Sequence, residues 1–188
     1  MVISINKISS GMGLLVENEI YVVIEYSHVK PGKGAAFVRV RLKKLKTDLV
    51  IERTFRTADK LEDIYLENRA AQFLYRSSSS FHFMDQTTYE EFTLNESQIG
   101  KGVKYLKDNL EVTAIFYDHQ LQKVILPNFI TFNVMETEPG IRGDSSRLGT
   151  KPAKIDTGAV VQVPLFVNAG DVIKIDTRSD DYIERVQQ

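Results

Sequence analysis

The segment Lys30-Pro31-Gly32-Lys33-Gly34 is the part of the chain whose residue types and spacing could do chemistry. Pro31 fixes its own φ angle, while Gly32 and Gly34 permit backbone turns that other residues resist. The segment therefore predicts a stiff, narrow loop with the amine of Lys33 at its tip. An amine held in this way can donate hydrogen bonds and supply positive charge. The same five residues also fit an ordinary solvated turn, and their local sequence leaves both interpretations open.

A phosphate-binding loop is the first alternative for a Gly-Lys-Gly sequence, and the context argues against it. In a P-loop the lysine is followed by Ser or Thr and then by a helix. Here Gly34 follows Lys33, and the next run, Ala35–Leu45, has a β pattern. No helix N-terminus is then available to bind the anion. We therefore expect no nucleotide and no other cofactor.

Other kinds of reactive site have no signature in the chain. His28, His82 and His119 are scattered, and there is no cysteine, so no pair of metal ligands has the usual spacing. No G-x-S-x-G nucleophile motif occurs. The carboxylates show no recognisable acid/base pair. We predict a non-enzymatic protein without catalytic residues or a metal site.

The charges are distributed unevenly along the 188 residues, although the net charge is only −1. Residues 1–62 contain 11 Lys or Arg against 7 Asp or Glu, whereas the remaining two thirds are each net acidic. A local basic field can steer an anionic partner even when the whole protein is close to neutral. The N-terminal third is therefore the expected binding region for such a partner.

Two β-type runs, Ile20–Val29 and Ala35–Leu45, flank the lysine loop and predict a long hairpin. The second run alternates apolar and basic residues: Val38, Val40 and Leu42 against Arg39, Arg41 and Lys43. A half-buried strand gives this alternation. The outward face of the hairpin is therefore expected to be strongly basic.

The rest of the chain also reads as short strands separated by turns. Two hairpins are expected around the serines 77–80 and around residues 118–120, and late strands at 159–167 and 171–176. Residues 96–107 are the best helix candidate, with Asn95 as its cap. Residues 57–69 are charged and show no clear period, and the stretch from Glu138 to Pro152 is polar and contains glycine. We predict an all-β protein of three small barrels, residues 1–62, 63–126 and 127–188.

Hydropathy gives two expectations about location. No apolar run approaches the roughly 18 residues that a membrane span requires. The first residues lack the apolar core of a signal peptide, because Lys7, Glu17 and Glu19 interrupt them. We expect a cytoplasmic protein with no membrane partner.

Sequence blocks along nearly the whole chain resemble the elongation factor P family, the bacterial relatives of the hypusine-bearing initiation factor of eukaryotes. The first block is Val29 to Val40, which contains the lysine loop, and Glu52-Arg53-Thr54-Phe55 follows. The most specific block runs from Gly149-Thr150-Lys151-Pro152-Ala153 to Val163-Pro164-Leu165-Phe166-Val167. These blocks occur in the family's order.

The resemblance implies a fold, a function and a set of partners. The fold is an N-terminal SH3-like (KOW-type) barrel followed by two OB-fold barrels, in an L-shaped arrangement that mimics tRNA. The function is to bind the 70S ribosome as a monomer, beside the P-site peptidyl-tRNA and ribosomal RNA, and to relieve stalling at consecutive prolines. Lys33 matches the lysine that a dedicated enzyme extends in many members.

The resemblance also implies roles for other residues. Lys30, Pro31, Gly32 and Gly34 form the tRNA-directed loop around Lys33. Further RNA contacts are implied for a larger set: Arg39, Arg41, Gly143, Asp144, Ser145, Tyr182 and Arg185. For Tyr182 and Arg185, closure of the final barrel is an equally good interpretation.

The rival hypothesis is a generic OB-fold protein that binds RNA or single-stranded nucleic acid and has no ribosomal role. Such a protein needs aromatic platforms beside a basic groove. Phe73, Tyr75, Phe81 and Phe83 could supply the aromatics. Because residues 63–127 are net acidic, these side chains are more consistent with a core.

Overall fold

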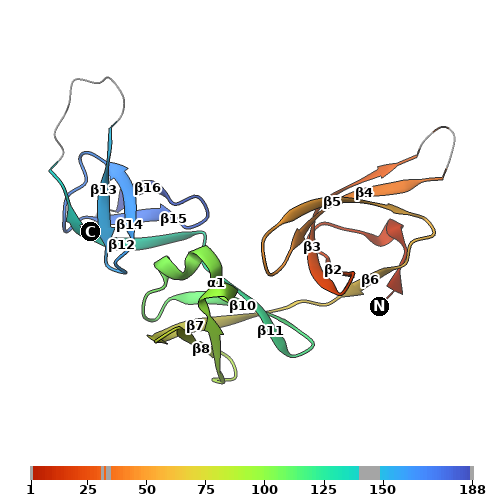
Figure 1. Cartoon of the computed structure of the whole chain (residues 1–188), viewed down its shortest axis with the longest axis horizontal. Helices are drawn as coiled ribbons and strands as arrows, with labels where there is room; N and C mark the ends of the chain where they lie inside the picture. Colours follow the sequence, from red (N-terminus) through yellow and green to blue (C-terminus); the bar gives the residue numbers. More distant parts are fainter. Residues whose placement is uncertain (1, 31, 33–34, 140–148, 187–188) are drawn as a thin grey trace. The chain divides into compact units, whose positions relative to one another are not determined.

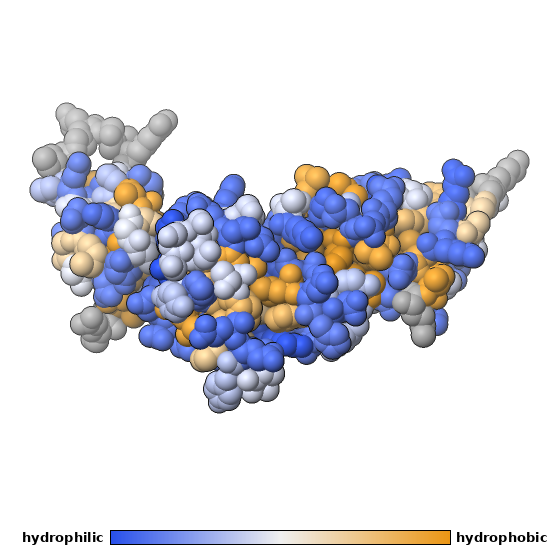
Figure 2. Space-filling model, turned by 60° about the horizontal axis from the view of Figure 1, so that its bottom comes forward, coloured by the Kyte–Doolittle hydropathy of each residue, from blue (hydrophilic) through white to orange (hydrophobic). Residues whose placement is uncertain are grey.

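The computed structural model describes residues 2–30, 32, 35–139 and 149–186. These residues form sixteen strands and a single short α-helix, so the predicted all-β class is confirmed (Figure 1). The chain divides into two compact units: residues 1–69 with 114–123, and residues 70–113 with 124–188. Hydrophilic side chains dominate the face shown in Figure 2, and apolar residues appear there as separate patches. No helix within the described residues is long and apolar enough to cross a membrane.

The first sheet contains the predicted hairpin. β3 pairs antiparallel with β4, and β4 pairs antiparallel with β5, so the three strands lie side by side (Figure 1). The strand order is β1-β6-β2-β3-β4-β5. The bounds are β1 Val2–Ile3, β2 Gly13–Val16, β3 Glu19–Val29, β4 Phe37–Lys44, β5 Val50–Arg56 and β6 Leu61–Ile64, with a 3-10 turn, η1, at Ile5–Lys7.

The core of this sheet follows from the alternation in β4. Val38, Val40 and Leu42 are completely buried. They pack in one cluster with residues of η1, such as Ile5, and with Phe55 of β5. The other face of β4 then carries Arg39, Arg41 and Lys43, as the alternation predicts.

The second sheet has the order β11-β10-β7-β8-β9. Both predicted hairpins are present: Ser77 pairs with Ser80 across one turn, and Asp118 and His119 adopt positive φ angles in the other. Positive φ angles at both central residues suit the twist of a two-residue hairpin turn. The bounds are β7 Glu67–Ser77, β8 Ser80–Asp85, β9 Glu91–Asn95, β10 Glu111–Tyr117 and β11 Gln120–Ile125.

The helix predicted for residues 96–107 is only partly correct. Asn95 caps α1 (Glu96–Ile99) in a capping box with Gln98. Gly100 then adopts a φ of +72°, which ends the α-helix. The chain continues as a 3-10 helix, η2 (Gly100–Tyr105). The glycine therefore converts one expected helix into two short pieces.

The third sheet is a closed barrel in the order β12-β13-β14-β16-β15. Its core contains Phe132, Val163 and Ile173, together with Tyr105 of η2. The bounds are β12 Phe129–Thr137, β13 Thr150–Ile155, β14 Val160–Pro164, β15 Val172–Asp176 and β16 Asp181–Val186.

Two strands lie in or next to stretches for which the sequence predicts no strand. β6 lies within residues 57–69, and β13 contains Pro152, where the expected polar stretch ends. In β13, Lys151, Ala153 and Ile155 point inward while the residues between them are exposed. Lys151 is buried, and its amine donates a hydrogen bond to the Glu138 carbonyl, 2.7 Å away. Because lysine is a polar residue type, a hydropathy pattern does not identify this position as an inward one.

Candidate functional site

The lysine loop connects β3 to β4, as the sequence predicts. The two strands stay paired up to Val29 and Phe37, so the loop is held at the end of a hairpin. Lys30 and Gly32 are exposed. Pro31, Lys33 and Gly34 lie outside the described residues.

Gly32 does not have the conformation that its residue type suggested. Its φ angle lies outside the left-handed range, and a Cβ atom there would meet no atom within 4 Å. Among the described residues, neither a left-handed φ angle nor a close contact therefore requires a glycine at this position.

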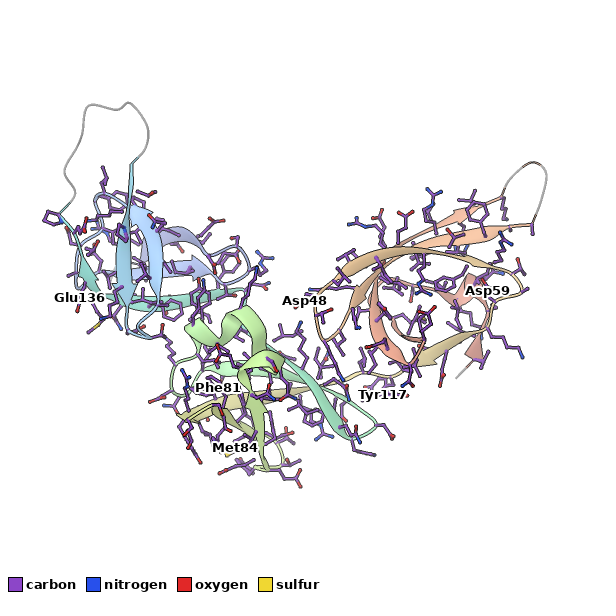
Figure 3. All side chains as sticks on the ribbon, in the orientation of Figure 1. Asp48, Asp59, Phe81, Met84, Tyr117 and Glu136 are labelled. Carbon is purple, nitrogen blue, oxygen red and sulfur yellow. The ribbon has the colours of Figure 1, made fainter. Side chains whose placement is uncertain are left out.

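The hydroxyl group of Thr57 ties the start of β4 to the chain that follows β5. It donates a hydrogen bond to the Ala36 carbonyl, at 3.2 Å. The backbone N–H of Arg56 in turn donates to the carboxylate of Asp59, at 2.7 Å. These two hydrogen bonds fix the backbone next to the loop. Asp59 is labelled in Figure 3 at one end of the sheet, and Asp48, in the β4–β5 turn, lies at the other.

The outward face of the hairpin is less basic than predicted. Arg41 forms an ion pair with Glu25 of β3, and Arg39 forms one with Glu52 of β5, each with an N–O distance of 3.3 Å. Lys43 pairs with Asp48 at 2.8 Å. The alternation of β4 placed the basic side chains correctly. It could not reveal that the neighbouring strands bring carboxylates to the same face.

Arg53 of β5 makes a two-armed ion pair with the turn between β2 and β3. Both terminal nitrogens of Arg53 contact the carboxylate of Glu17, at 2.6 and 2.7 Å. The hydrogen bond from Arg53 is the main cause that lowers the pKa of Glu17. A bidentate pair of this kind fixes geometry as well as charge. Arg53 therefore holds the turn between β2 and β3 against β5.

The aromatic residues proposed for a generic nucleic-acid platform lie mostly in the core. Phe73, Phe81 and Phe83 are each at most 3% exposed, and the ring of Phe73 contacts Phe81 in a tilted arrangement and Phe83 edge-on. Tyr75 is exposed and stacks on His82 with a centroid distance of 4.4 Å. Of the four aromatic residues, therefore, only Tyr75 is accessible for stacking on a base, whereas the rival hypothesis requires several such rings.

Tyr182 and Arg185 of β16 are brought together with a third residue, Phe166. The ring of Phe166 contacts Tyr182 edge-on, with centroids 6.3 Å apart, and the Arg185 guanidinium lies 5.7 Å from the Phe166 centroid. Arg185 also pairs with Asp171 at 3.5 Å. Tyr182 packs against the barrel core, whereas Phe166 is 56% exposed. Gly143, Asp144 and Ser145 lie outside the described residues.

The described part of the chain offers no cluster of three or more side chains that could hold a metal ion. Its strongly shifted pKa values have structural causes: burial and a hydrogen bond to Asp180 raise that of Tyr105, and an ion pair lowers that of Asp176. Asp176 has its pKa lowered to about 2, chiefly by hydrogen bonds from Arg178. This carboxylate is fully committed to the guanidinium, at 2.6 and 2.9 Å. Such shifts indicate structural contacts here rather than a general acid or base.

Comparison with known proteins gives the same family along the whole chain. The KOW-like domain of elongation factor P matches residues 4–61, its OB domain residues 66–124, and its C-terminal domain residues 130–185. Elongation factor P of Moorella thermoacetica is 46% identical over 97% of this chain and 99% of its own length. The protein of that name from Desulfitobacterium hafniense is 48% identical over the same shares.

Solved structures agree on the fold. Eukaryotic translation initiation factor 5A from Methanococcus jannaschii is 24% identical, with a TM-score of 0.53 over 66% of this chain and 94% of the other. A protein of the same factor family from Naegleria fowleri is 11% identical, with a TM-score of 0.51 over 67% and 98%. At these identities the likeness shows the fold alone. The family matches and the close relatives show that this chain belongs to the elongation factor P family, and is therefore a translation elongation factor and not an enzyme.

Proposed function

We propose that this factor binds the 70S ribosome beside the P-site peptidyl-tRNA and stimulates peptide-bond formation at consecutive prolines. The observation that carries the proposal is the match of all three elongation factor P domains, in order, along the chain. The described geometry supports it with a hairpin whose strands stay paired up to the residue before Lys30. Hydrogen bonds of Thr57 and Asp59 fix the backbone next to the loop.

The mechanism follows from what such a hairpin can supply. Proline is a poor peptidyl donor and acceptor, so the positioning of the reacting groups limits the rate. A stiff arm that orders the tRNA end reduces the entropic part of the barrier without providing an acid or base. In this proposal Lys33 reaches the tRNA end, and a lysine-modifying enzyme lengthens its side chain and adds hydrogen-bond donors.

The other implied contacts have separate places in the proposal. Gly143, Asp144 and Ser145 face the small subunit, while Tyr182 and Arg185 contact tRNA or ribosomal RNA. The exposed ring of Phe166 beneath Arg185 is consistent with an RNA contact at that site. The protein works as a cytoplasmic monomer without a cofactor.

The test is a reporter that contains a polyproline tract, translated in a strain that lacks this factor. We expect full-length product to fall without the factor, to recover with the wild type, and to stay low with Lys33→Ala. A reporter without the tract should be unaffected in all three strains. Equal rescue by Lys33→Ala would exclude the lysine mechanism. The intact mass of the protein from its native host, with mapping of residues 30–39, would show whether Lys33 is extended.

The generic nucleic-acid-binding alternative makes the opposite prediction. It requires tight binding to free single strands and no binding to 70S ribosomes. The burial of Phe73, Phe81 and Phe83 weighs against it.

A further inference from the structure

The outward face of the three strands β3, β4 and β5 changes its charge along the length of the strands. Three rows of aligned residues cross it, in order toward the lysine loop: Glu25–Arg41–Glu52, Ser27–Arg39–Thr54 and Val29–Phe37–Arg56. The first row has two carboxylates around one arginine. The second has an arginine between two hydroxyl-bearing residues, and the third has an arginine beside two apolar residues. The row farthest from the loop is therefore net negative, and the two rows nearer to the loop are net positive.

The arginines of these rows also differ in their partners. Arg41 is paired with Glu25, and Arg39 with Glu52. Arg56 is exposed, and no described carboxylate lies within ion-pair distance of its guanidinium. Asp59 contacts Arg56 only through the backbone N–H.

The chain on either side of the loop adds further cations. Lys30 and Lys60 are exposed, and neither has an ion-pair partner among the described residues. Within the described parts of segments 28–38 and 55–60, these lysines and Arg56 are accompanied by one carboxylate, that of Asp59. The residue aligned with Arg56 on β4 is the apolar Phe37, which offers no carboxylate to the guanidinium.

We propose that Arg56, together with Lys30, is the phosphate-binding end of this face, and that its ligand is the backbone of an RNA. Arg41 is then a structural residue that joins β3 to β4. The inference rests on the proposed function, because it places a contact of the same hairpin. A guanidinium matches the geometry of phosphate oxygens, and one without a carboxylate partner gives up no existing ion pair on binding.

RNA is favoured over an acidic protein surface by the family of the chain, whose members act in translation. RNA binding has a characteristic salt dependence, because each phosphate that a protein cation neutralises releases counterions. The slope of log K against log salt then changes by about 0.7 to 0.9 for each phosphate contacted. The contribution of Arg56 can therefore be counted separately from the rest of the interface.

The experiment measures binding of the full chain to 70S ribosomes that carry peptidyl-tRNA in the P site, over a series of KCl concentrations. Arg56→Gln should bind more weakly at low salt, and its slope of log K against log salt should be shallower by about 0.7 to 0.9. Arg56→Lys keeps the positive charge and should have a slope close to that of the wild type. Lys46→Gln is the matched control, because it removes the same charge from the exposed β4–β5 turn. The double variant Glu25→Gln/Arg41→Gln removes the neutralised pair. Both controls should keep the wild-type slope.

Several outcomes would overturn the inference. An unchanged slope for Arg56→Gln would do so, as would an equal change for Lys46→Gln, which would indicate a general charge effect. If the wild type failed to bind ribosomes at every salt concentration, the proposed function would fail as well, and the two failures are thus distinguishable. Matching thermal unfolding of the variants would confirm that each is folded.

A second measurement separates RNA from protein as the ligand. The chain contains no cysteine, so Arg56→Cys gives one site for a cysteine-directed aryl azide. Photocrosslinks from this site to ribosomal RNA or tRNA would support the proposal. Crosslinks to ribosomal proteins alone would overturn it in favour of an acidic protein surface.

Discussion

The hydroxyl group of Tyr105 donates a hydrogen bond of 2.7 Å to Asp180, which lies 75 positions away in the sequence. Tyr105 is completely buried and belongs to the core of the C-terminal barrel, although it lies at the end of η2. Lys104 donates to the other oxygen of Asp180, also at 2.7 Å, and its carbonyl accepts a hydrogen bond from Thr157. Two adjacent residues of η2 therefore fix this helix to the barrel.

The first prediction concerns the free energy of unfolding that this contact supplies. Burial, and then the hydrogen bond to Asp180, raise the pKa of Tyr105, so the hydroxyl remains a donor at neutral pH. We expect Tyr105→Phe to cost about 1 to 2 kcal/mol, because Asp180 keeps Lys104 and can be partly rehydrated. Tyr105→Ala should cost about 3 to 5 kcal/mol, because it also leaves a cavity.

Urea unfolding of the unit formed by residues 70–113 and 124–188 checks both values. Tyr89→Phe is the control, because Tyr89 is 72% exposed and its substitution should change little. Equal stability of Tyr105→Ala and the wild type would contradict the role of Tyr105 in the core.

The second prediction concerns the ion pair between Asp48 and Lys123. Lys123 is 9% exposed, whereas Asp48 is half exposed and has a second partner, Lys43. Burial alone would raise the pKa of Asp48, but hydrogen bonds from both lysines outweigh it and lower that pKa. Removal of Asp48 therefore leaves Lys123 without this ion-pair partner, whereas removal of Lys123 leaves Asp48 paired with Lys43.

We expect Asp48→Asn to destabilise the protein more than Lys123→Met. Loss of the carboxylate leaves a buried ammonium without its counter-charge, at a cost of about 1 to 3 kcal/mol after allowance for solvent at Asp48. Loss of the lysine leaves Asp48 with Lys43. Asn tolerates the φ of +60° at position 48, so the backbone is not an added variable. Thermal unfolding of the unit formed by residues 1–69 and 114–123 gives the order, and the reverse order would contradict this account.

The third prediction concerns acid unfolding. Hydrogen bonds from Arg178 lower the pKa of Asp176 to about 2, while an unfolded aspartate titrates near its ordinary value of about 3.9. Between these values the unfolded chain binds more protons, so its population rises as the pH falls. The stabilisation is complete above about pH 4 and is lost as the pH falls through about 2.

Arg178→Gln should return the pKa of Asp176 toward its ordinary value and make this decline shallower. The measurement is the urea midpoint between pH 5 and pH 2, with Arg76→Gln as the control, since the described Arg76 side chain donates to a carbonyl and not to a carboxylate. Parallel curves for the wild type and Arg178→Gln would show that Asp176 does not contribute.

The sequence predicts those features that depend on neighbours along the chain. The β3–β4 hairpin follows from the alternation of Val38, Val40 and Leu42, and the cap at Asn95 follows from a local pattern. The pairing of Arg41 with Glu25 is different, because it depends on the strand register and on a bulge between Val23 and Glu25.

Longer-range features are even less accessible from a single sequence. The insertion of Tyr105 into the C-terminal core joins residues that no local period relates. The strand β13 was missed because its inward side chains include Lys151, whose amine is satisfied by a backbone carbonyl. In each case the deciding interaction is tertiary, and the local residue types point elsewhere.

The last prediction compares two glycines of the N-terminal sheet. A Cβ atom on Gly13 would lie 2.9 Å from the Ile64 carbonyl oxygen, and backbone cannot move aside as a side chain can. Gly13→Ala should therefore push β2 away from β6 and cost about 1 to 3 kcal/mol. Gly32→Ala should leave the free energy of unfolding almost unchanged, because the added atom has no neighbour and the φ angle is not left-handed.

The same pair of variants separates folding from function at the lysine loop. Under the proposed function, any loss of polyproline translation in Gly32→Ala arises from the ribosomal complex, since the free protein remains stable. Thermal unfolding and the polyproline reporter should be measured on both variants. If Gly32→Ala lowered the unfolding temperature as much as Gly13→Ala, the open surroundings of Gly32 would not describe the folded protein.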